Sequence, residues 1–301
     1  MRVLRFIGTL FAASIIIFLL MRAVPGNPAR VALGVNATDE AVEKLTHSMG
    51  LDRPLLVQYL EWMKGLFTGN FGISLSSQQD ITPLVLDRAQ VTLLLIGLAI
   101  ALALVGAIPM GILLARFRLP VLNAATQLGI AVPSFLVGIL LVAVFSVHLG
   151  WLPANGWQLP REGLSHLVLP VISLALVQGA MLTRYVRATL TEEMDKDYIR
   201  TARSLGESRT GALIRHGLRN AALPVLTVTG VQLSTLVVGA VVIENVFVIP
   251  GLGSMLLDAV STRDLTTIQT LIMVFVTFTL TVNLLTDLAY RVIDPRLKEA
   301  R

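Results

Sequence analysis

Long apolar runs, separated by shorter polar segments, are the dominant pattern along the 301 residues of this chain. A helix needs about 20 consecutive apolar residues to cross a bilayer. Six runs are close to this length or exceed it, and they cover residues 6–24, 91–115, 122–149, 164–183, 223–243 and 268–290. The pattern therefore predicts an all-α polytopic membrane protein with six transmembrane helices. The first run resembles a signal peptide, but no small-residue cleavage site follows it cleanly, so we expect an uncleaved anchor.

The segment between the first two runs, residues 25–90, has helical signals of its own. Thr38 is suited to cap a helix that Gly50 ends, with two acids in its first turn. A second helix is expected from Pro54 to Gly69, with apolar side chains along one face. We predict that both helices lie on the outer face of the bundle or in the interface plane.

Residues 244–253 cannot continue as a straight, lipid-exposed helix. Glu244, Pro250 and two glycines in this segment need a protein interior or a water-lined cavity at membrane depth. Glu244, Phe247, Pro250 and Gly251 are therefore candidate gate or cavity residues. The alternative for Glu244, which we favour, is a hydrogen bond to the backbone of the Pro-Gly turn.

The composition excludes an ordinary soluble enzyme. The chain is 54% hydrophobic and only 14% charged, and its mean hydropathy is +0.76. It has no cysteine, which excludes a disulfide framework, a thiolate metal site and a cysteine nucleophile.

The net charge of +5 could indicate nucleic-acid binding, but its distribution fits membrane topology instead. With the N-terminus inside, 16 of the 24 Lys and Arg residues fall in cytoplasmic segments, as the positive-inside rule requires. We therefore expect both termini in the cytoplasm and no nucleic-acid partner.

The cytoplasmic segment 184–223 contains eight of these basic residues and is the most informative part of the chain. Ile199, Ala202 and Leu205 recur with a spacing that places them along one side of a short helix. Gly206 then allows a sharp turn, and a second short helix is expected from about Gly211 to near Pro224. Such a helical pair is typical of a docking surface. The alternative is a solvated linker, but 40 residues with helix signals exceed what a linker needs.

This segment resembles the "EAA" loop of peptide permeases, the membrane subunits of binding-protein-dependent ABC importers. The resemblance is carried by DYIRTARSLG at 197–206 and RHGLRNAALP at 215–224. Further segments extend it over nearly the whole chain: PGNP at 25–28, GLDRPLLVQYLEW at 50–62, GNFGISL at 69–75, ENVFVIPGLG at 244–253, RDLTTIQ at 263–269 and NLLTDLAYRVIDPR at 283–296. Together they are similar to the dipeptide, oligopeptide and nickel permease group, and to its first membrane subunit.

The resemblance implies a type I importer permease fold and a coupling helix that sits in a cleft of an ATP-hydrolysing subunit. The residues implied in coupling are Asp197, Tyr198, Ile199, Arg200, Thr201, Ala202, Arg203 and Gly206. Arg200 and Thr201 stand where the general motif has Glu and Ala, and the Leu-Pro pair comes four residues late. Peptide permeases commonly share both departures.

The implied organisation has four parts: an anchor helix at 1–24, an external helical segment at 25–90, a permease core at 91–290 that includes the coupling loop at 184–223, and a cytoplasmic tail at 291–301. The implied partners are a homologous second permease, two ABC ATPase subunits or domains, an external substrate-binding protein and the lipid bilayer. The implied function is import of dipeptides or oligopeptides, with nickel or another small solute as the alternative.

Other functions lack their characteristic residues. No Walker A motif occurs, so this chain is expected to be a transporter subunit that binds no cofactor itself. The resemblance implies that ATP and Mg²⁺ are used by the partner ATPases. The four histidines show no metal-binding spacing; His148 and His166 could meet near the outer face, but we favour simple interfacial packing and expect no metal. An ion-coupled carrier is disfavoured because the spans are nearly free of charge, and an intramembrane protease because its catalytic constellations are absent.

Overall fold

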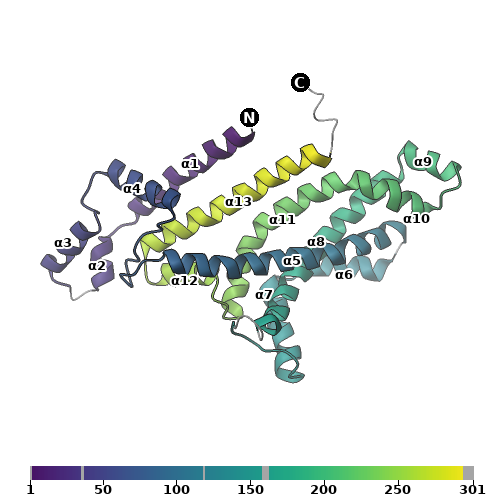
Figure 1. The fold of residues 1–301 in the computed structure, drawn as a ribbon. Coiled ribbons are helices and arrows are strands. Elements are labelled where there is room, and N and C mark those ends of the chain that lie inside the picture. Colours follow the sequence, from purple (N-terminus) through teal and green to yellow (C-terminus); the bar gives the residue numbers. More distant parts are fainter. Residues whose placement is uncertain (1, 35–36, 118, 158–162, 294–301) are drawn as a thin grey trace. The chain divides into compact units, whose positions relative to one another are not determined.

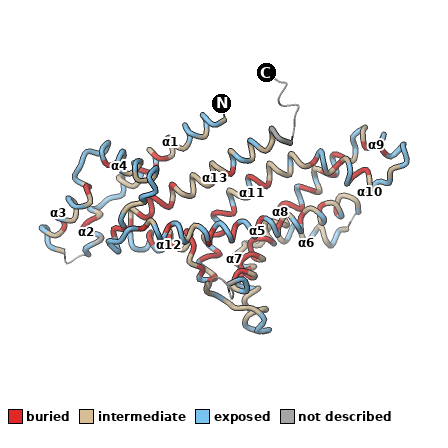
Figure 2. Tube along the Cα trace, viewed as in Figure 1, coloured by how far each residue is buried: buried red, intermediate tan, exposed pale blue. Residues whose placement is uncertain are grey.

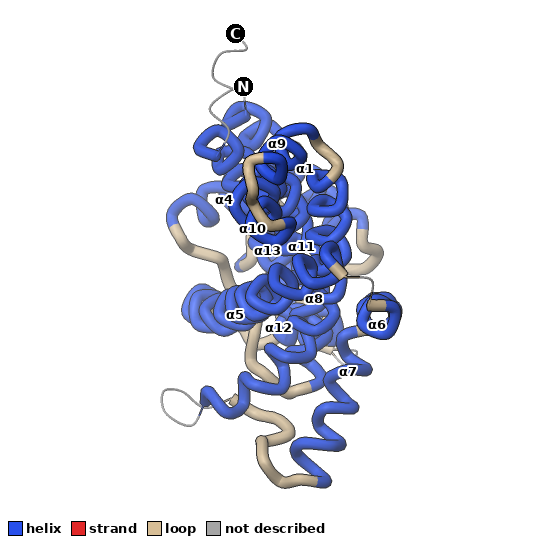
Figure 3. The backbone as a smooth tube through the Cα atoms, turned by 90° about the vertical axis from the view of Figure 1, so that its right-hand side faces the viewer, coloured by secondary structure: helices blue, strands red, loops and turns tan. Residues whose placement is uncertain are grey.

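The computed structural model describes residues 2–34, 37–117, 119–157 and 163–293, and these residues form helices joined by loops (Figures 1 and 3). The elements of the first part of the chain are α1 (Arg2–Ala23), α2 (Pro28–Leu33), α3 (Asp39–Ser48), α4 (Leu55–Thr68), α5 (Thr82–Arg116), α6 (Pro120–Ala131), α7 (Ser134–Leu141) and the π-helical η1 (Val142–His148). Those of the second part are α8 (Gly163–Met194), α9 (Asp197–Ser204), α10 (Arg209–Ala212), the π-helical η2 (Leu213–Gly217), α11 (Leu218–Val246), α12 (Leu252–Ser261) and α13 (Leu265–Ile293). The predicted all-α fold is confirmed.

Among the described residues, five helices are long and apolar enough to cross a membrane, or six if α6, α7 and η1 are counted together as one span. The predicted span over 122–149 is not one straight helix, because α6 and the helix formed by α7 and η1 are bent by 104° relative to each other. The break lies at Val132, whose extended backbone precedes Pro133. A residue before proline is driven out of the helical region by contact with the proline ring, which accounts for the break.

Residues 1–92 and 250–281 form one compact unit, called unit 1 here, and residues 93–249 and 282–301 form a second, unit 2. In unit 1, α3 and α4 confirm the two helices predicted in the external segment. Thr38 caps α3 by accepting a hydrogen bond from the Ala41 amide, and Gly69 ends α4 in the left-handed conformation. Pro54 lies just ahead of α4 as its N-cap. The short helices α2 and α12 were not predicted.

A buried carboxylate joins distant segments of unit 1. Asp264, which is 3% exposed, accepts hydrogen bonds from the Leu75 amide at 3.0 Å and the Thr267 hydroxyl at 2.7 Å. It also accepts bonds from the Thr267 amide and from the hydroxyls of Ser74 and Ser76. Asp264 therefore fastens the loop before α5 to the start of α13.

In unit 2, α8 is the central element and packs against α6, α7 and α11. Half of its most apolar stretch is buried (Figure 2). Gly111 lets α5 approach α8 closely, because an added Cβ would lie 2.5 Å from Val186 Cγ1. Val186 belongs to a buried cluster with Leu190, Leu213 and Ala221.

The second cytoplasmic helix was predicted to end near Pro224, but it continues past this residue. It begins with α10, where Ser208 caps the Gly211 amide at 3.0 Å, and continues through η2 into α11. Pro224 lies inside α11. Prolines are tolerated in spanning helices where neighbours or local π turns satisfy the freed backbone groups, and η2 lies just ahead of Pro224.

Candidate functional site

The short helix α9 has one buried face and one exposed face. Ile199 and Ala202, which are 2% and 9% exposed, form a buried cluster with Ala212 of α10. Arg200, Thr201 and Arg203 are exposed. The tie to α10 therefore fixes the orientation of α9 and presents its basic face to the solvent.

The spacing of Leu205 predicted that it shares one side of the helix with Ile199 and Ala202, but it does not lie on the buried side. It is the C-cap residue of α9 and is 81% exposed. A position six residues on is rotated by about 120° from the first residue, since a helix has 3.6 residues per turn. The C-terminal end of α9 therefore exposes a large apolar side chain.

Gly206 forms the turn that ends α9. Its φ is +94°, its amide donates to the Arg203 carbonyl at 3.1 Å, and the Glu207 amide donates to the Ala202 carbonyl at 3.1 Å. These two bonds are the Schellman pattern, which uses a left-handed residue after the helix and strongly favours glycine. The predicted sharp turn at Gly206 is confirmed.

A buried acid near the end of α8 forms hydrogen bonds with residues at the start of α9. Glu193, which is 6% exposed, accepts hydrogen bonds from the Tyr198 hydroxyl and the Lys196 ammonium group. Burial and the bond to Glu193 raise the pKa of the Tyr198 phenol, so its hydroxyl stays protonated and can donate. The bond to Glu193 also raises the pKa of Lys196. Sequence reasoning did not single out Glu193, because its partner Tyr198 meets it only once α9 has folded against the end of α8.

A surface pocket of about 460 Å³ lies beside α9 and is lined by Tyr198, Thr201, Ala202, Leu205, Glu207, Arg215 and His216. Glu207 lies 3.4 Å from both the Arg215 guanidinium and the His216 imidazole. The pocket thus combines an apolar edge with a charged edge. Sequence reasoning did not single out Glu207, because its partners come from η2.

The candidate gate residues Glu244 and Phe247 are buried within unit 2. Glu244 is 0% and Phe247 is 1% exposed. Phe247 packs beneath Gly138, where an added Cβ would lie 2.9 Å from its ring, and its carbonyl accepts a bond from the Gly156 amide at 2.9 Å. Phe247 therefore packs tightly at the end of α11, and a gating role for Glu244 and Phe247 stays a prediction.

The other two candidates, Pro250 and Gly251, belong to unit 1, where Gly251 is the N-cap of α12. Its amide donates to the Ser254 hydroxyl at 3.1 Å. Val248, which belongs to unit 2 and lies in the turn after α11, is strained. Its φ of +53° is a rare conformation for a β-branched residue. A gating role for Pro250 and Gly251 stays a prediction as well.

Unit 2 also contains an apolar groove of about 770 Å³ between α5, α6, α7, η1 and α8. Of the described residues that line it, only Thr126 and Thr183 carry a hydroxyl group. None of the candidate gate residues lines it.

The two histidines considered for an outer-face site come from different elements, η1 and α8. His148 ends η1, and the His166 ring lies 3.4 Å from the Ser165 hydroxyl. Among the described residues, no group of three or more His, Cys, Asp or Glu side chains could hold a metal ion. That this chain binds no metal or cofactor stays an expectation.

Comparison with known proteins gives the family. Residues 107–299 match the model of the "binding-protein-dependent transport system inner membrane component", and residues 1–96 match the N-terminal model for membrane components of these systems. The chain is 37% identical over 304 residues to the glutathione transport system permease protein GsiC of Escherichia coli (strain K12), covering 99% of this chain and 97% of that protein. It is 39% identical over 310 residues, with the same coverage, to a Brucella suis biovar 1 (strain 1330) protein whose name assigns it provisionally as a peptide permease.

A solved structure shares the fold. A chain in the crystal structure of an amino acid ABC transporter with histidines superimposes with a TM-score of 0.56 at 19% identity, covering 70% of this chain and 94% of that chain. The chain therefore belongs to the binding-protein-dependent transport system inner membrane components and is a permease subunit of an ABC importer.

Proposed function

We propose that this permease subunit forms half of a translocation path for short peptides, and that α9 is the element through which partner ATPases drive it. The peptide class is supported by the names of its relatives, which refer to glutathione, itself a tripeptide, and to peptides. The second half of the path would be a homologous permease. An external binding protein would deliver the peptide.

The observation that carries the coupling role is the construction of α9. It is a short rigid helix held by Ile199, Ala202 and the Glu193–Tyr198 bond, and it ends in a tight glycine turn. Its exposed face presents Arg200, Arg203 and Leu205, which suit an acidic and apolar cleft on a partner. ATP binding would close the two ATPase subunits and move α9, and through it α8 and α11.

Reconstitution tests the transport function. The chain is co-expressed with a second permease and ATPase subunits, placed in vesicles, and supplied with a binding protein and labelled dipeptides, glutathione or Ni²⁺. Peptide uptake that requires ATP is expected. Uptake of Ni²⁺ in preference to peptides would contradict the substrate class, and uptake by the chain without an ATPase would contradict the coupling.

Replacing Gly206 with Val tests the lever. The φ of +94° is strained for any residue with a side chain, although no atom lies within 4 Å of the added Cβ. We expect ATP hydrolysis to continue while uptake falls about tenfold or more. The matched control is Gly69→Val, which places the same residue at a left-handed helix end with equally open surroundings, but on external α4. Unchanged uptake in Gly206→Val would overturn the lever assignment.

A further inference from the structure

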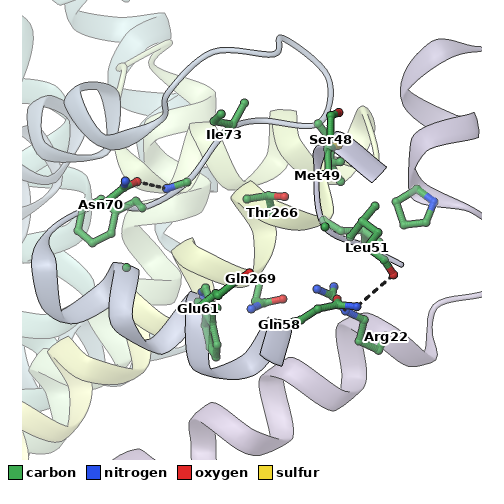
Figure 4. A pocket seen from close by; sticks show the side chains of 18 of the residues that line it. Arg22, Ser48, Met49, Leu51, Gln58, Glu61, Asn70, Ile73, Thr266 and Gln269 are labelled. Atoms are coloured by element: carbon green, nitrogen blue, oxygen red, sulfur yellow. Dashed lines mark hydrogen bonds between the residues drawn. The ribbon is translucent and has the colours of Figure 1, made fainter. Parts of the chain in front are cut away.

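A cavity of about 530 Å³ lies wholly within unit 1 (Figure 4). It is bounded by the end of α1, the turn after α3, one side of α4, the loop at residues 70–78 and the start of α13. Its volume is typical of a small-molecule site. The charge distribution places this part of the chain on the outer side of the membrane.

Arg22 is held at the cavity by two contacts that leave its outer nitrogens available. Its Nε donates to Gln58 Oε1 at 3.0 Å, and its guanidinium lies 4.8 Å from the centre of the Phe18 ring. Gln58 is itself oriented, because its Nε2 donates to the carbonyls of Leu51 and Arg53 at 3.1 and 2.8 Å. The terminal guanidinium nitrogens of Arg22 form no hydrogen bond with the residues that the structure describes.

Two further polar groups at the same cavity have no partner within the described parts of the chain, and the donor atom of one of them is buried. Gln269 is 4% exposed, and its side-chain amide makes no hydrogen bond there. The indole Nε1 of Trp62 is buried and unpaired. A buried donor left unsatisfied costs about 1 to 3 kcal/mol, so the indole N–H of Trp62 favours an acceptor at this cavity, and the Gln269 amide is available to bind one.

The side chains of Arg22, Gln58 and Gln269 converge on one part of the cavity from α1, α4 and α13 (Figure 4). We propose that this cavity binds the carboxylate of a small solute on the outer side of the membrane. A guanidinium fork matches the two oxygens of a carboxylate, and the Trp62 N–H and Gln269 amide add further donors.

The rest of the lining selects a small monoanion. Among the described residues that line the cavity, Arg22 and Glu61 are the only charged ones, and Glu61 is already paired with Arg53 at 2.5 Å. A single available cation matches one negative charge better than the two charges of phosphate. Met49, Leu51, Phe71 and Leu75 offer apolar surface for a short aliphatic group.

This site is distinct from the coupling helix, and the proposal does not depend on the transported solute. Binding to the purified chain can therefore fail or succeed independently of peptide uptake by the assembled transporter.

Trp62 provides a direct readout, because the chain has only three tryptophans. In the full-length chain with Trp151→Phe and Trp157→Phe, fluorescence reports Trp62 alone. N-Acetylalanine and N-acetylalaninamide are titrated in parallel, since the two probes differ only in the carboxylate. We expect N-acetylalanine to shift the emission saturably, and the amide to bind at least about tenfold more weakly, the loss of one charged interaction.

Two variants and a control locate the effect. Arg22→Gln is expected to weaken N-acetylalanine binding by about tenfold or more, and Gln269→Met by about fivefold, in proportion to a charged and a neutral hydrogen bond. Arg30→Gln, at an exposed arginine of α2 outside the cavity, should leave the affinity unchanged. Where Arg22→Gln fails to fold, Gln269→Met carries the test.

Three results would overturn the proposal. They are a Trp62 emission that does not respond to N-acetylalanine, an equal response to N-acetylalaninamide, and tighter binding of inorganic phosphate than of N-acetylalanine. An unchanged affinity in folded Gln269→Met would also overturn the assignment of this cavity.

Discussion

The hydroxyl of Tyr198, in the first turn of α9, donates a hydrogen bond to the buried carboxylate of Glu193, in the last turn of α8. This bond connects the proposed coupling helix directly to a spanning helix. A force applied to α9 thus reaches α8 through a side-chain contact as well as through the backbone.

Replacing Tyr198 with Phe removes this bond and keeps the ring. We expect a loss of about 1 to 2 kcal/mol in local stability, because the buried Glu193 carboxylate loses a donor. In reconstituted transporters, the number of ATP molecules hydrolysed per peptide imported should rise. Tyr185→Phe, at an exposed tyrosine of α8, is the matched control. An unaltered ratio in Tyr198→Phe would show that the backbone alone transmits the movement.

The same contact predicts a pH dependence in the alkaline range. The pKa values of Lys196 and Tyr198 are both raised above their ordinary values of 10.5 and 10.0 in the folded chain. Their contribution is therefore complete at neutral pH and is lost as the pH rises through the raised values. Hydrogen exchange of α9 amides, corrected for intrinsic rates, should stay constant from pH 7 to about 9.5 and accelerate above pH 10. Constant protection up to pH 11 would contradict this.

Val248 offers a stabilising substitution. Its φ of +53° costs about 1 kcal/mol or more for a residue with a branched side chain, and Asn tolerates this region better. The side chain is 63% exposed, so little packing is lost. Thermal unfolding should therefore show Val248→Asn to be more stable than the wild type by about 1 kcal/mol. Val248→Ala separates the loss of the branch from the backbone preference, and equal stability of both variants would argue against strain.

Asp264 is expected to be the most sensitive polar position in unit 1. Asp264→Ala removes the acceptor for five hydrogen bonds and leaves buried donors unsatisfied, which should cost more than about 3 kcal/mol. Asp258→Ala, at an exposed acid of α12, should change stability by less than about 0.5 kcal/mol. Unfolding of the two variants by urea measures the difference, and similar midpoints would refute the assigned role.

The sequence predicted what local chemistry determines. The caps at Thr38 and Gly69 and the turn at Gly206 were correct, because a cap depends on the residue itself and on its near neighbours. The two prolines show the limit of such signals: Pro133 marks a break, whereas Pro224 lies within a continuous helix. Which outcome occurs depends on how surrounding turns and helices satisfy the freed backbone groups.

Features that depend on distant partners could not be predicted. In the sequence, Glu193 is one acid among several, and only the folded chain shows that Tyr198 forms a hydrogen bond with it. Gln269 and Trp62 lie far apart in the sequence, and only the fold of unit 1 places both at one cavity with Arg22. Periodicity identifies buried faces, but it does not show which polar groups share a cavity.

The bond between Ser74 and Asp264 spans 190 positions of the chain. Because a ribosome releases the N-terminus first, the loop before α5 reaches the membrane long before its acceptor has been synthesised. Unit 1 can therefore close only after the whole of unit 2's main segment has been inserted, and α13 is the last part to complete it. A nascent chain that stalls before Asp264 would leave the hydroxyls of Ser74 and Ser76 without this acceptor.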